Sequence, residues 1–131
     1  MTSALTIRDE TASGQTLREW KLDVLVERIT VREILRSRVQ QEVDEFNRSE
    51  GLVFNGLVQP TDTEAALNGY RMQKRRSIDG KRQFEMAVEA FERGQVLVLV
   101  GDRQVETLED AIEVRQGTVV SFLRLVPLVG G

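Results

Sequence analysis

Apolar positions recur with two different spacings along the chain, and near the amino end the spacing is two. Leu5 and Ile7 alternate with polar neighbours, and a second alternating run follows in "EWKLDVLVER". The residues of that run that share one face are Trp20, Leu22, Val24 and Val26. Alternation is typical of a half-buried strand, and the Ser13-Gly14 pair between the runs is a turn signal. The first part of the chain therefore predicts a β-hairpin.

The segment from about Val31 to Phe46 has helical spacing instead. Thr30 is followed three residues later by Glu33, a capping box in which each side chain bonds the free backbone N–H of the other residue. The apolar positions that then recur are Val31, Ile34, Leu35, Val39, Val43 and Phe46. We expect an amphipathic helix whose apolar stripe faces a sheet.

A second amphipathic helix is predicted in "RQFEMAVEAFERG". Phe84, Val88 and Phe91 recur at helical spacing, and Gly94 follows where a helix C-cap is expected.

Between the two helices, residues 47 to about 82 are less regular. "LVFNGLV" fits a short strand with an Asn-Gly turn, and "TDTEAALNGY" begins with helix-capping residues and predicts one or two helical turns. "RMQKRRSIDGKR" groups Arg71, Lys74, Arg75, Arg76, Lys81 and Arg82. This basic segment is either a solvated loop or a docking surface for an acidic partner.

Three strands are expected in the last third of the chain. Gln95 to Val100 is almost wholly apolar, as in a central strand buried on both faces, and "RQVE" follows as a short strand. "TLEDAIEV" fits a short helical turn that places Leu108, Ile112 and Val114 in the core. "TVVSFLRLV" is the last strand, with Phe122 in the core. Because no repeat or linker interrupts the chain, we expect a single domain over residues 1–131.

Composition excludes several kinds of chemistry. The chain has no cysteine and no histidine, which removes thiolate nucleophiles, cysteine zinc sites and histidine-based triads. The carboxylates Glu42, Asp44, Glu45, Glu109 and Asp110 are expected on solvated faces, so no catalytic or metal-binding residue is predicted. We therefore do not expect an enzyme.

The net charge of −3 and the absence of a long apolar run bear on partners and location. They make nucleic acid an unexpected partner and predict no membrane association. The amino end lacks the features of a signal peptide, so a cytoplasmic location is expected.

The order of these elements resembles the ubiquitin-like proteins. A hairpin, a helix across it and further strands closing the same sheet are the β-grasp layout, and "QVLVLVGDRQVETLEDAIEVRQGTVVSFLRLVPLVGG" resembles the end of a ubiquitin-like chain. "ITVREIL" and "LVPLVGG" are also similar to the small sulfur carriers, namely the molybdopterin-synthase small subunit and the thiamine-pathway carrier. The resemblance covers about Ala4 to Phe46 and Gln95 to Gly131. It implies an α+β fold, a mixed sheet wrapped on a helix, with an insert at about 47–94 and a C-terminal tail at 127–131.

In the families that the chain resembles, the working group is the carboxylate of the last glycine. The resemblance implies that Gly131, preceded by Gly130, is adenylated by a ubiquitin-activating-like enzyme that uses ATP, with no cofactor bound to this chain. Glycine lacks a Cβ, which lets a tail thread a narrow channel. The residues expected to contact the partner are Leu123, Leu125, Pro127, Leu128 and Val129.

Three functions remain open on this basis. The first is a ubiquitin-like modifier joined to target amines, with a conjugating enzyme and a deconjugating peptidase as further partners. The second is a sulfur carrier that holds a thiocarboxylate on Gly131 for cofactor biosynthesis or tRNA thiolation and passes it to a synthase. The third is a non-covalent interaction module that uses the same fold.

Overall fold

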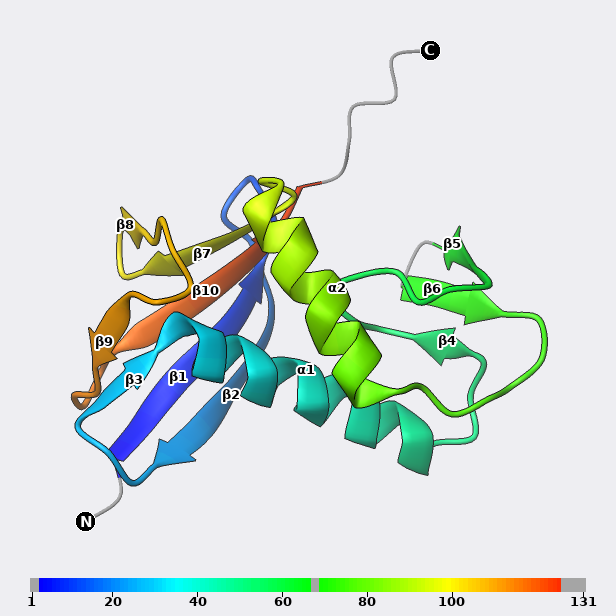
Figure 1. The fold of residues 1–131 in the computed structure, drawn as a ribbon, viewed down its shortest axis with the longest axis horizontal. Helices are drawn as coiled ribbons and strands as arrows, with labels where there is room; N and C mark the ends of the chain where they lie inside the picture. Colours follow the sequence, from blue (N-terminus) through cyan, green and yellow to red (C-terminus); the bar gives the residue numbers. More distant parts are fainter. Residues whose placement is uncertain (1–2, 67–68, 126–131) are drawn as a thin grey trace. The chain divides into compact units, whose positions relative to one another are not determined.

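The structure is a computed structural model that describes residues 3–66 and 69–125. These residues form an α+β fold, in the order β1 Ser3–Glu10, β2 Thr16–Val24, β3 Arg28–Thr30, α1 Val31–Arg48, β4 Val53–Phe54, β5 Thr63–Ala66, β6 Gly69–Met72, α2 Gly80–Glu92, β7 Val96–Val100, β8 Arg103–Gln104, β9 Ala111–Glu113 and β10 Val119–Arg124 (Figure 1). The chain divides into two compact units. The terminal unit contains the residues up to Ile34 and those from Phe91 onward, and the central unit is Leu35–Ala90.

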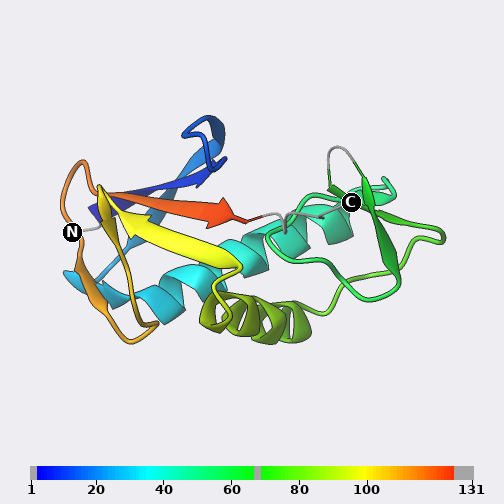
Figure 2. The same ribbon diagram turned by 90° about the horizontal axis from the view of Figure 1, so that it is seen from above.

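A five-stranded mixed sheet organises the terminal unit. Its strand order is β2-β1-β10-β7-β8, and β1 and β10, the first and last strands, run parallel as neighbours (Figure 2). The other neighbouring pairs are antiparallel, which confirms the predicted β1–β2 hairpin. Gly14 has a φ of 92° in the turn, a left-handed conformation that glycine adopts without strain.

One face of this sheet forms the core of the terminal unit. Successive side chains of a strand point to opposite faces of the sheet. In the central strands β1 and β10, Thr6 and Ser121 of the opposite face are buried as well. The fully or almost fully buried side chains are Leu5, Ile7, Val96, Val98, Val120 and Phe122. In β7, however, Leu97 and Leu99 are only half-buried, so the prediction that this strand is buried on both faces was wrong. The opposite face of the sheet remains partly open.

The start of α1 matches the predicted capping site. The backbone N–H of Glu33 donates to Thr30 Oγ1 over 3.2 Å. The N–H groups of Val31 and Arg32, which a helix leaves without internal partners, donate to the carbonyl oxygens of Asp110 and Leu108.

The hydrogen bonds from the start of α1 to Asp110 and Leu108 explain why the predicted helical turn in "TLEDAIEV" was wrong. The segment "TLEDAIEV" contains strand β9, paired with β3, instead of a helical turn. Its carbonyl groups are used by the first turn of α1, and the N–H of Val114 donates to the carbonyl of Glu27. Leu108, Ile112 and Val114 are nevertheless buried, as predicted.

The central unit contains the rest of α1, most of α2 and a three-stranded antiparallel sheet in the order β4-β6-β5. The predicted strand near Val53 is present, but "TDTEAALNGY" contributes β5 and the start of β6 in place of helical turns. Asp62 has a φ of 59°, which helices do not accommodate, and Gln59 Nε2 donates to the carbonyl of Thr63. The polar residues that indicated a helix cap therefore form a turn between strands.

The second helix forms as predicted, but a different face of it is buried. Its buried residues are Gln83, Ala87 and Ala90, whereas the expected stripe of Phe84, Val88 and Phe91 is half-buried. Gln83 Nε2 donates to the carbonyl of Val58 over 2.8 Å, so its burial leaves this amide group satisfied.

Phe46 and Trp20, the aromatic residues of the predicted apolar helix stripe and strand face, differ in burial. Phe46 is buried and packs edge-on against Phe54, with 5.6 Å between ring centroids. Trp20 is only half-buried, because β2 is the edge strand of its sheet.

Gly56 follows β4 and has no room for a side chain. A Cβ at this position would lie 2.1 Å from Cε1 of the fully buried Phe54 and 3.0 Å from Oε1 of Glu42. The predicted Asn55-Gly56 turn is absent here, and the requirement for glycine comes from packing instead.

We therefore expect Gly56→Ala to lower the free energy of unfolding by about 1–3 kcal/mol, because the Phe54 ring must leave its position. Gly51→Ala is the matched control, since its Cβ would meet nothing within 4 Å. The measurement is urea denaturation followed by circular dichroism. Equal stability of the two variants would contradict the close packing at Gly56.

Candidate functional site

The candidate site is the end of β10, from which the predicted tail continues. Leu123 lies opposite Leu97 of β7, and Arg124 lies opposite Val96. The backbone N–H of Leu125 donates to the carbonyl of Gln95 over 2.9 Å. The last strand is therefore held to β7 up to the final described residue.

Of the residues predicted to contact a partner, Leu123 and Leu125 can be placed. Leu123 is half-buried and Leu125 is 37% exposed. Pro127, Leu128, Val129, Gly130 and Gly131 lie outside the described residues.

Leu123 belongs to a strip of three leucines on the outer face of the sheet. Because opposite residues in neighbouring strands share a face, Leu123 and Leu97 point to the side opposite the buried Phe122 and Val98. Leu99 is two residues along β7 on the same face, so we name Leu97, Leu99 and Leu123 the outer leucine strip. All three are half-buried.

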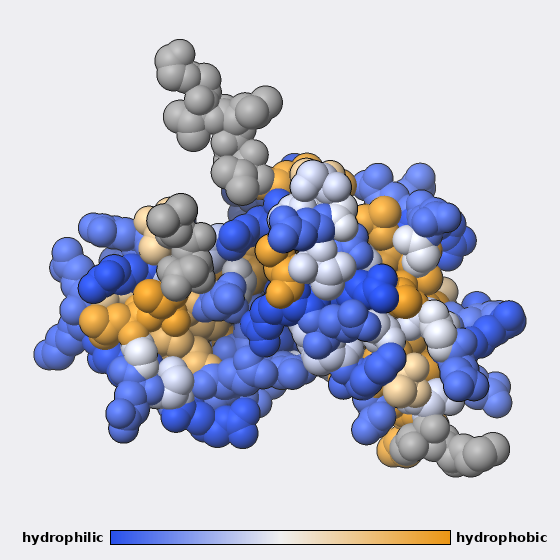
Figure 3. All heavy atoms as spheres, turned by 180° about the vertical axis from the view of Figure 1, so that it is seen from behind, coloured by the Kyte–Doolittle hydropathy of each residue, from blue (hydrophilic) through white to orange (hydrophobic). Residues whose placement is uncertain are grey.

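Polar residues border the outer leucine strip. Glu10 lies opposite Leu123 and Arg8 lies opposite Ser121 across the β1–β10 pair, and the Ser121 hydroxyl is 3.2 Å from a carboxylate oxygen of Glu10. Seen from behind Figure 1, hydrophobic atoms reach the surface in limited areas among hydrophilic side chains (Figure 3). The register and burial of these residues make the strip a small apolar contact area with polar neighbours on β1, next to the point where the tail begins.

A groove of about 530 Å³ also lies in the terminal unit. It is bounded by the end of α2 at Phe91 and Glu92, the start of β7 and the segment 105–109. Arg32 and Glu109 line this groove and form an ion pair, with 2.6 Å between Arg32 Nη2 and Glu109 Oε1. This hydrogen bond raises the pKa of Arg32 above its ordinary value, so the guanidinium stays charged. The sequence analysis did not predict the groove, because its borders come from segments far apart in the chain.

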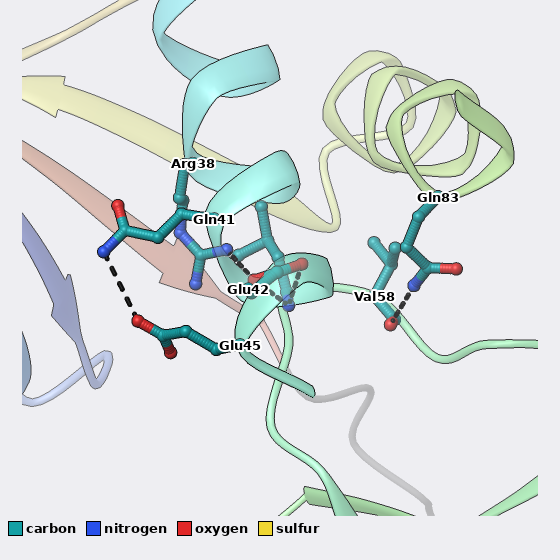
Figure 4. A network of polar contacts seen from close by, with 7 residues as sticks. Arg38, Gln41, Glu42, Glu45, Val58 and Gln83 are labelled. Atoms are coloured by element: carbon teal, nitrogen blue, oxygen red, sulfur yellow. Dashed lines mark hydrogen bonds and ion pairs between the residues drawn. The ribbon is translucent and has the colours of Figure 1, made fainter. Parts of the chain in front are cut away.

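The expectation that all the carboxylates are solvated was wrong for Glu42. Glu42 and Arg38 are both buried and form an ion pair one helical turn apart (Figure 4). The backbone N–H of Leu57 donates to both carboxylate oxygens of Glu42, at 3.3 and 3.2 Å. These contacts neutralise a charge that would otherwise be costly to bury. The position of Arg38 four residues before Glu42 was the available signal.

The other four carboxylates are exposed, as predicted. Gln40 Nε2 donates to Asp44, Gln41 Nε2 donates to Glu45, and Thr107 Oγ1 bonds Asp110. Within residues 3–66 and 69–125, no group of three or more acidic side chains could hold a metal ion.

The basic segment has two kinds of residue. Arg71, Lys74, Arg76, Lys81 and Arg82 are exposed. Arg75 instead contacts the end of α1, because its guanidinium donates to the carbonyl oxygens of Phe46 and Gly51 and lies 4.4 Å from the centroid of the Phe46 ring. Arg75 therefore stabilises the helix C-terminus, where carbonyl groups lack internal partners.

None of the helices in the described part of the chain is long and apolar enough to cross a membrane.

Comparison with protein families, curated proteins and solved structures gives no match.

We expect Glu42→Gln to lower the free energy of unfolding by roughly 3 kcal/mol, because the buried Arg38 guanidinium loses the carboxylate with which it forms an ion pair. The double variant Arg38→Met/Glu42→Gln should recover much of this loss, since it removes both charges and keeps an acceptor for the Leu57 N–H. Asp44→Asn, on an exposed face of α1, should change stability by less than about 0.5 kcal/mol. Urea denaturation of the three variants checks these values. A double variant no more stable than Glu42→Gln would contradict the role assigned to the pair.

Proposed function

We propose that the chain has a β-grasp fold and is a ubiquitin-like protein modifier activated at Gly131. The observation that carries the proposal is the sheet of the terminal unit. The hairpin β1–β2, the helix α1 and the later strands β7, β8 and β10 joined to the same sheet have the β-grasp order. The parallel β1–β10 pair also supports it, because it places the final strand in the middle of the sheet.

The proposed reaction uses chemistry supplied by a partner enzyme. A carboxylate oxygen of Gly131 attacks the α-phosphorus of ATP, and pyrophosphate leaves. An amine of the target, after direct or relayed transfer, then attacks the carbonyl carbon and AMP leaves. The new bond is an isopeptide, and the amine proton is released. A ubiquitin-activating-like enzyme performs the first step, and a conjugating enzyme and a deconjugating peptidase are further proposed partners.

This chain's own part is to present the tail. The hydrogen bond between Leu125 and Gln95 ties the last described residue to β7. From there, six residues reach at most about 20 Å when fully extended. The outer leucine strip is the proposed contact for the activating enzyme, because it is the apolar area next to the start of the tail.

The proposal requires Gly131 to be the carboxyl end of the mature protein, whether as synthesised or after processing. The sulfur carrier is the second candidate, favoured by the similarity of "LVPLVGG" to that family's tails. The two candidates share the adenylation step and differ in the atom that receives the acyl group.

The decisive experiment compares a tagged full chain with a variant lacking Gly130 and Gly131, each expressed in the native cell and purified under denaturing conditions. We expect conjugates of higher mass for the full chain alone. Arg124 is the last arginine or lysine of the sequence, so trypsin would leave the remnant Leu125–Gly131 on target lysines. Mass spectrometry detects this remnant.

The alternatives give different results in the same samples. A thiocarboxylate on Gly131, with sulfur in place of one oxygen, indicates the sulfur carrier. Identical behaviour of the full chain and the deletion variant would contradict both candidates and favour a non-covalent interaction module.

The outer leucine strip gives a second prediction. Leu97→Asp and Leu123→Asp should each reduce conjugate formation by tenfold or so, because the contact area loses its apolar surface and gains a charge that must be desolvated. Leu25→Asp is the control, since Leu25 is 82% exposed and lies outside the strip. Conjugates are quantified in cells, and circular dichroism of the purified variants verifies folding. Unchanged conjugation by folded strip variants would exclude the strip as the contact.

A further inference from the structure

The two edges of the terminal-unit sheet differ greatly in length. At one edge, β8 has only the two residues Arg103–Gln104, whereas at the other edge β2 has the nine residues Thr16–Val24 (Figure 2). Within the described part of the chain, no strand pairs with the outer side of β2. A long edge strand offers a row of backbone N–H and C=O groups to another strand.

We propose that two copies of this chain associate through β2, antiparallel and centred on Trp20. A twofold axis perpendicular to the sheet keeps each residue from Arg18 to Leu22 on its own face. Trp20 then lies opposite the partner's Trp20, and Glu19 lies opposite the partner's Lys21. The β1–β2 register shifts between Asp9 and Glu10, so β2 is regular from Arg18 onward, and the register centred on Trp20 pairs Arg18–Leu22 with the same five residues of the other copy. The two five-stranded sheets become one continuous sheet across the interface.

Pairing of opposite charges favours this register over the neighbouring registers. Glu19 and Lys21 share the outer face of the sheet, where they lie opposite Arg8 and Thr6 of β1. In the register centred on Trp20, each Glu19 meets a Lys21 of the other copy, which gives two opposite-charge pairs. A shift that centres the pairing on Glu19 or on Lys21 instead places two like charges in direct opposition, which destabilises a strand pair. A shift of the partner strand by an odd number of residues would place outer-face residues opposite core-face residues.

Contacts within one chain place these charged groups for pairing. Glu19 Oε2 is 3.4 Å from Arg8 Nε, and Lys21 Nζ donates to Thr6 Oγ1. The Glu19 side chain remains 45% exposed, and Lys21 is also exposed. Both groups are therefore held on the outer face at the edge of the sheet while staying open to a neighbouring strand.

Trp20 provides the apolar centre of the interface. It lies opposite the buried Ile7 but is itself only half-buried, and the Arg18 guanidinium is 5.3 Å from the centroid of its ring. Pairing two such strands brings the two indole rings together and extends each core across the interface. A second copy fits better than an unrelated extended peptide, because the strand is complementary to itself in both charge and apolar position.

The first test measures association of the wild-type protein. We expect sedimentation velocity between about 1 μM and 1 mM to show a monomer–dimer equilibrium. Trp20 is the only tryptophan, so its fluorescence spectrum should change over the same concentrations as the dimer forms. A protein that stays monomeric up to the highest concentration would overturn the proposal.

The second test exchanges the charges. Glu19→Lys alone and Lys21→Glu alone place like charges opposite each other in a homodimer, and each should weaken dimerisation at least about tenfold. An equimolar mixture of the two variants restores both opposite-charge pairs, so a heterodimer should form with near wild-type affinity. The double variant Glu19→Lys/Lys21→Glu also restores the pairs within a homodimer.

Asp102→Lys is the control, because it makes the same change in net charge as Glu19→Lys in the turn beside β8, at the opposite edge of the sheet. It should dimerise like the wild type. Circular dichroism verifies that each variant folds. If a single variant does not fold, the double variant still tests the register. Failure of both the folded mixture and the folded double variant to dimerise would show that this register is wrong.

Discussion

The parallel pairing of β1 with β10 is the constraint on which the terminal unit depends. Thr6 to Glu10 pair in sequence with Val119 to Leu123, so the two ends of the chain must meet before the five-stranded sheet exists. The entropic cost of closing so long a loop grows only slowly with its length, which permits the central unit, Leu35–Ala90, to be inserted. The same non-local pairing makes slow folding the expectation for this sheet.

Helix α1 contributes residues to both units, and its terminal backbone groups have different hydrogen-bond partners in each. Its first N–H groups donate to carbonyls of the segment that leads into β9, whereas its last carbonyls accept hydrogen bonds from Arg75 in the central unit. Between these ends, the buried Glu42 holds the backbone N–H of Leu57. The contacts at the two ends of the helix oppose fraying, because each supplies a partner for backbone groups that the helix leaves unpaired.

Periodicity and capping sufficed where an element is defined by its own residues. The β1–β2 hairpin, α1 and the final strand could be predicted from alternation, the Thr30–Glu33 pair and the apolar run before Arg124. The errors occur where a residue far away in the sequence supplies the partner. The carbonyls of Leu108 and Asp110 bond the first turn of α1 and β9 pairs with β3, and α2 buries Gln83 because the Val58 carbonyl accepts its amide N–H. Of the candidate site, Leu123 and Leu125 follow from the strand pattern, whereas the assignment of Pro127 to Gly131 remains a prediction based on resemblance.

The two faces of β10 explain how one strand can support both folding and presentation of a tail. Val120 and Phe122 are buried on one face, while Leu123 faces outward with Leu97 and Leu99. A partner that contacts the outer leucine strip therefore does not have to disturb the core, and the bond from Leu125 to Gln95 fixes where the reach of the tail begins. In the proposed reaction, the groups that activate the terminal carboxylate come from the partner enzyme. The paired edge at β2 is separated from β10 by β1, so the proposed dimer leaves both copies of the strip open to such a partner.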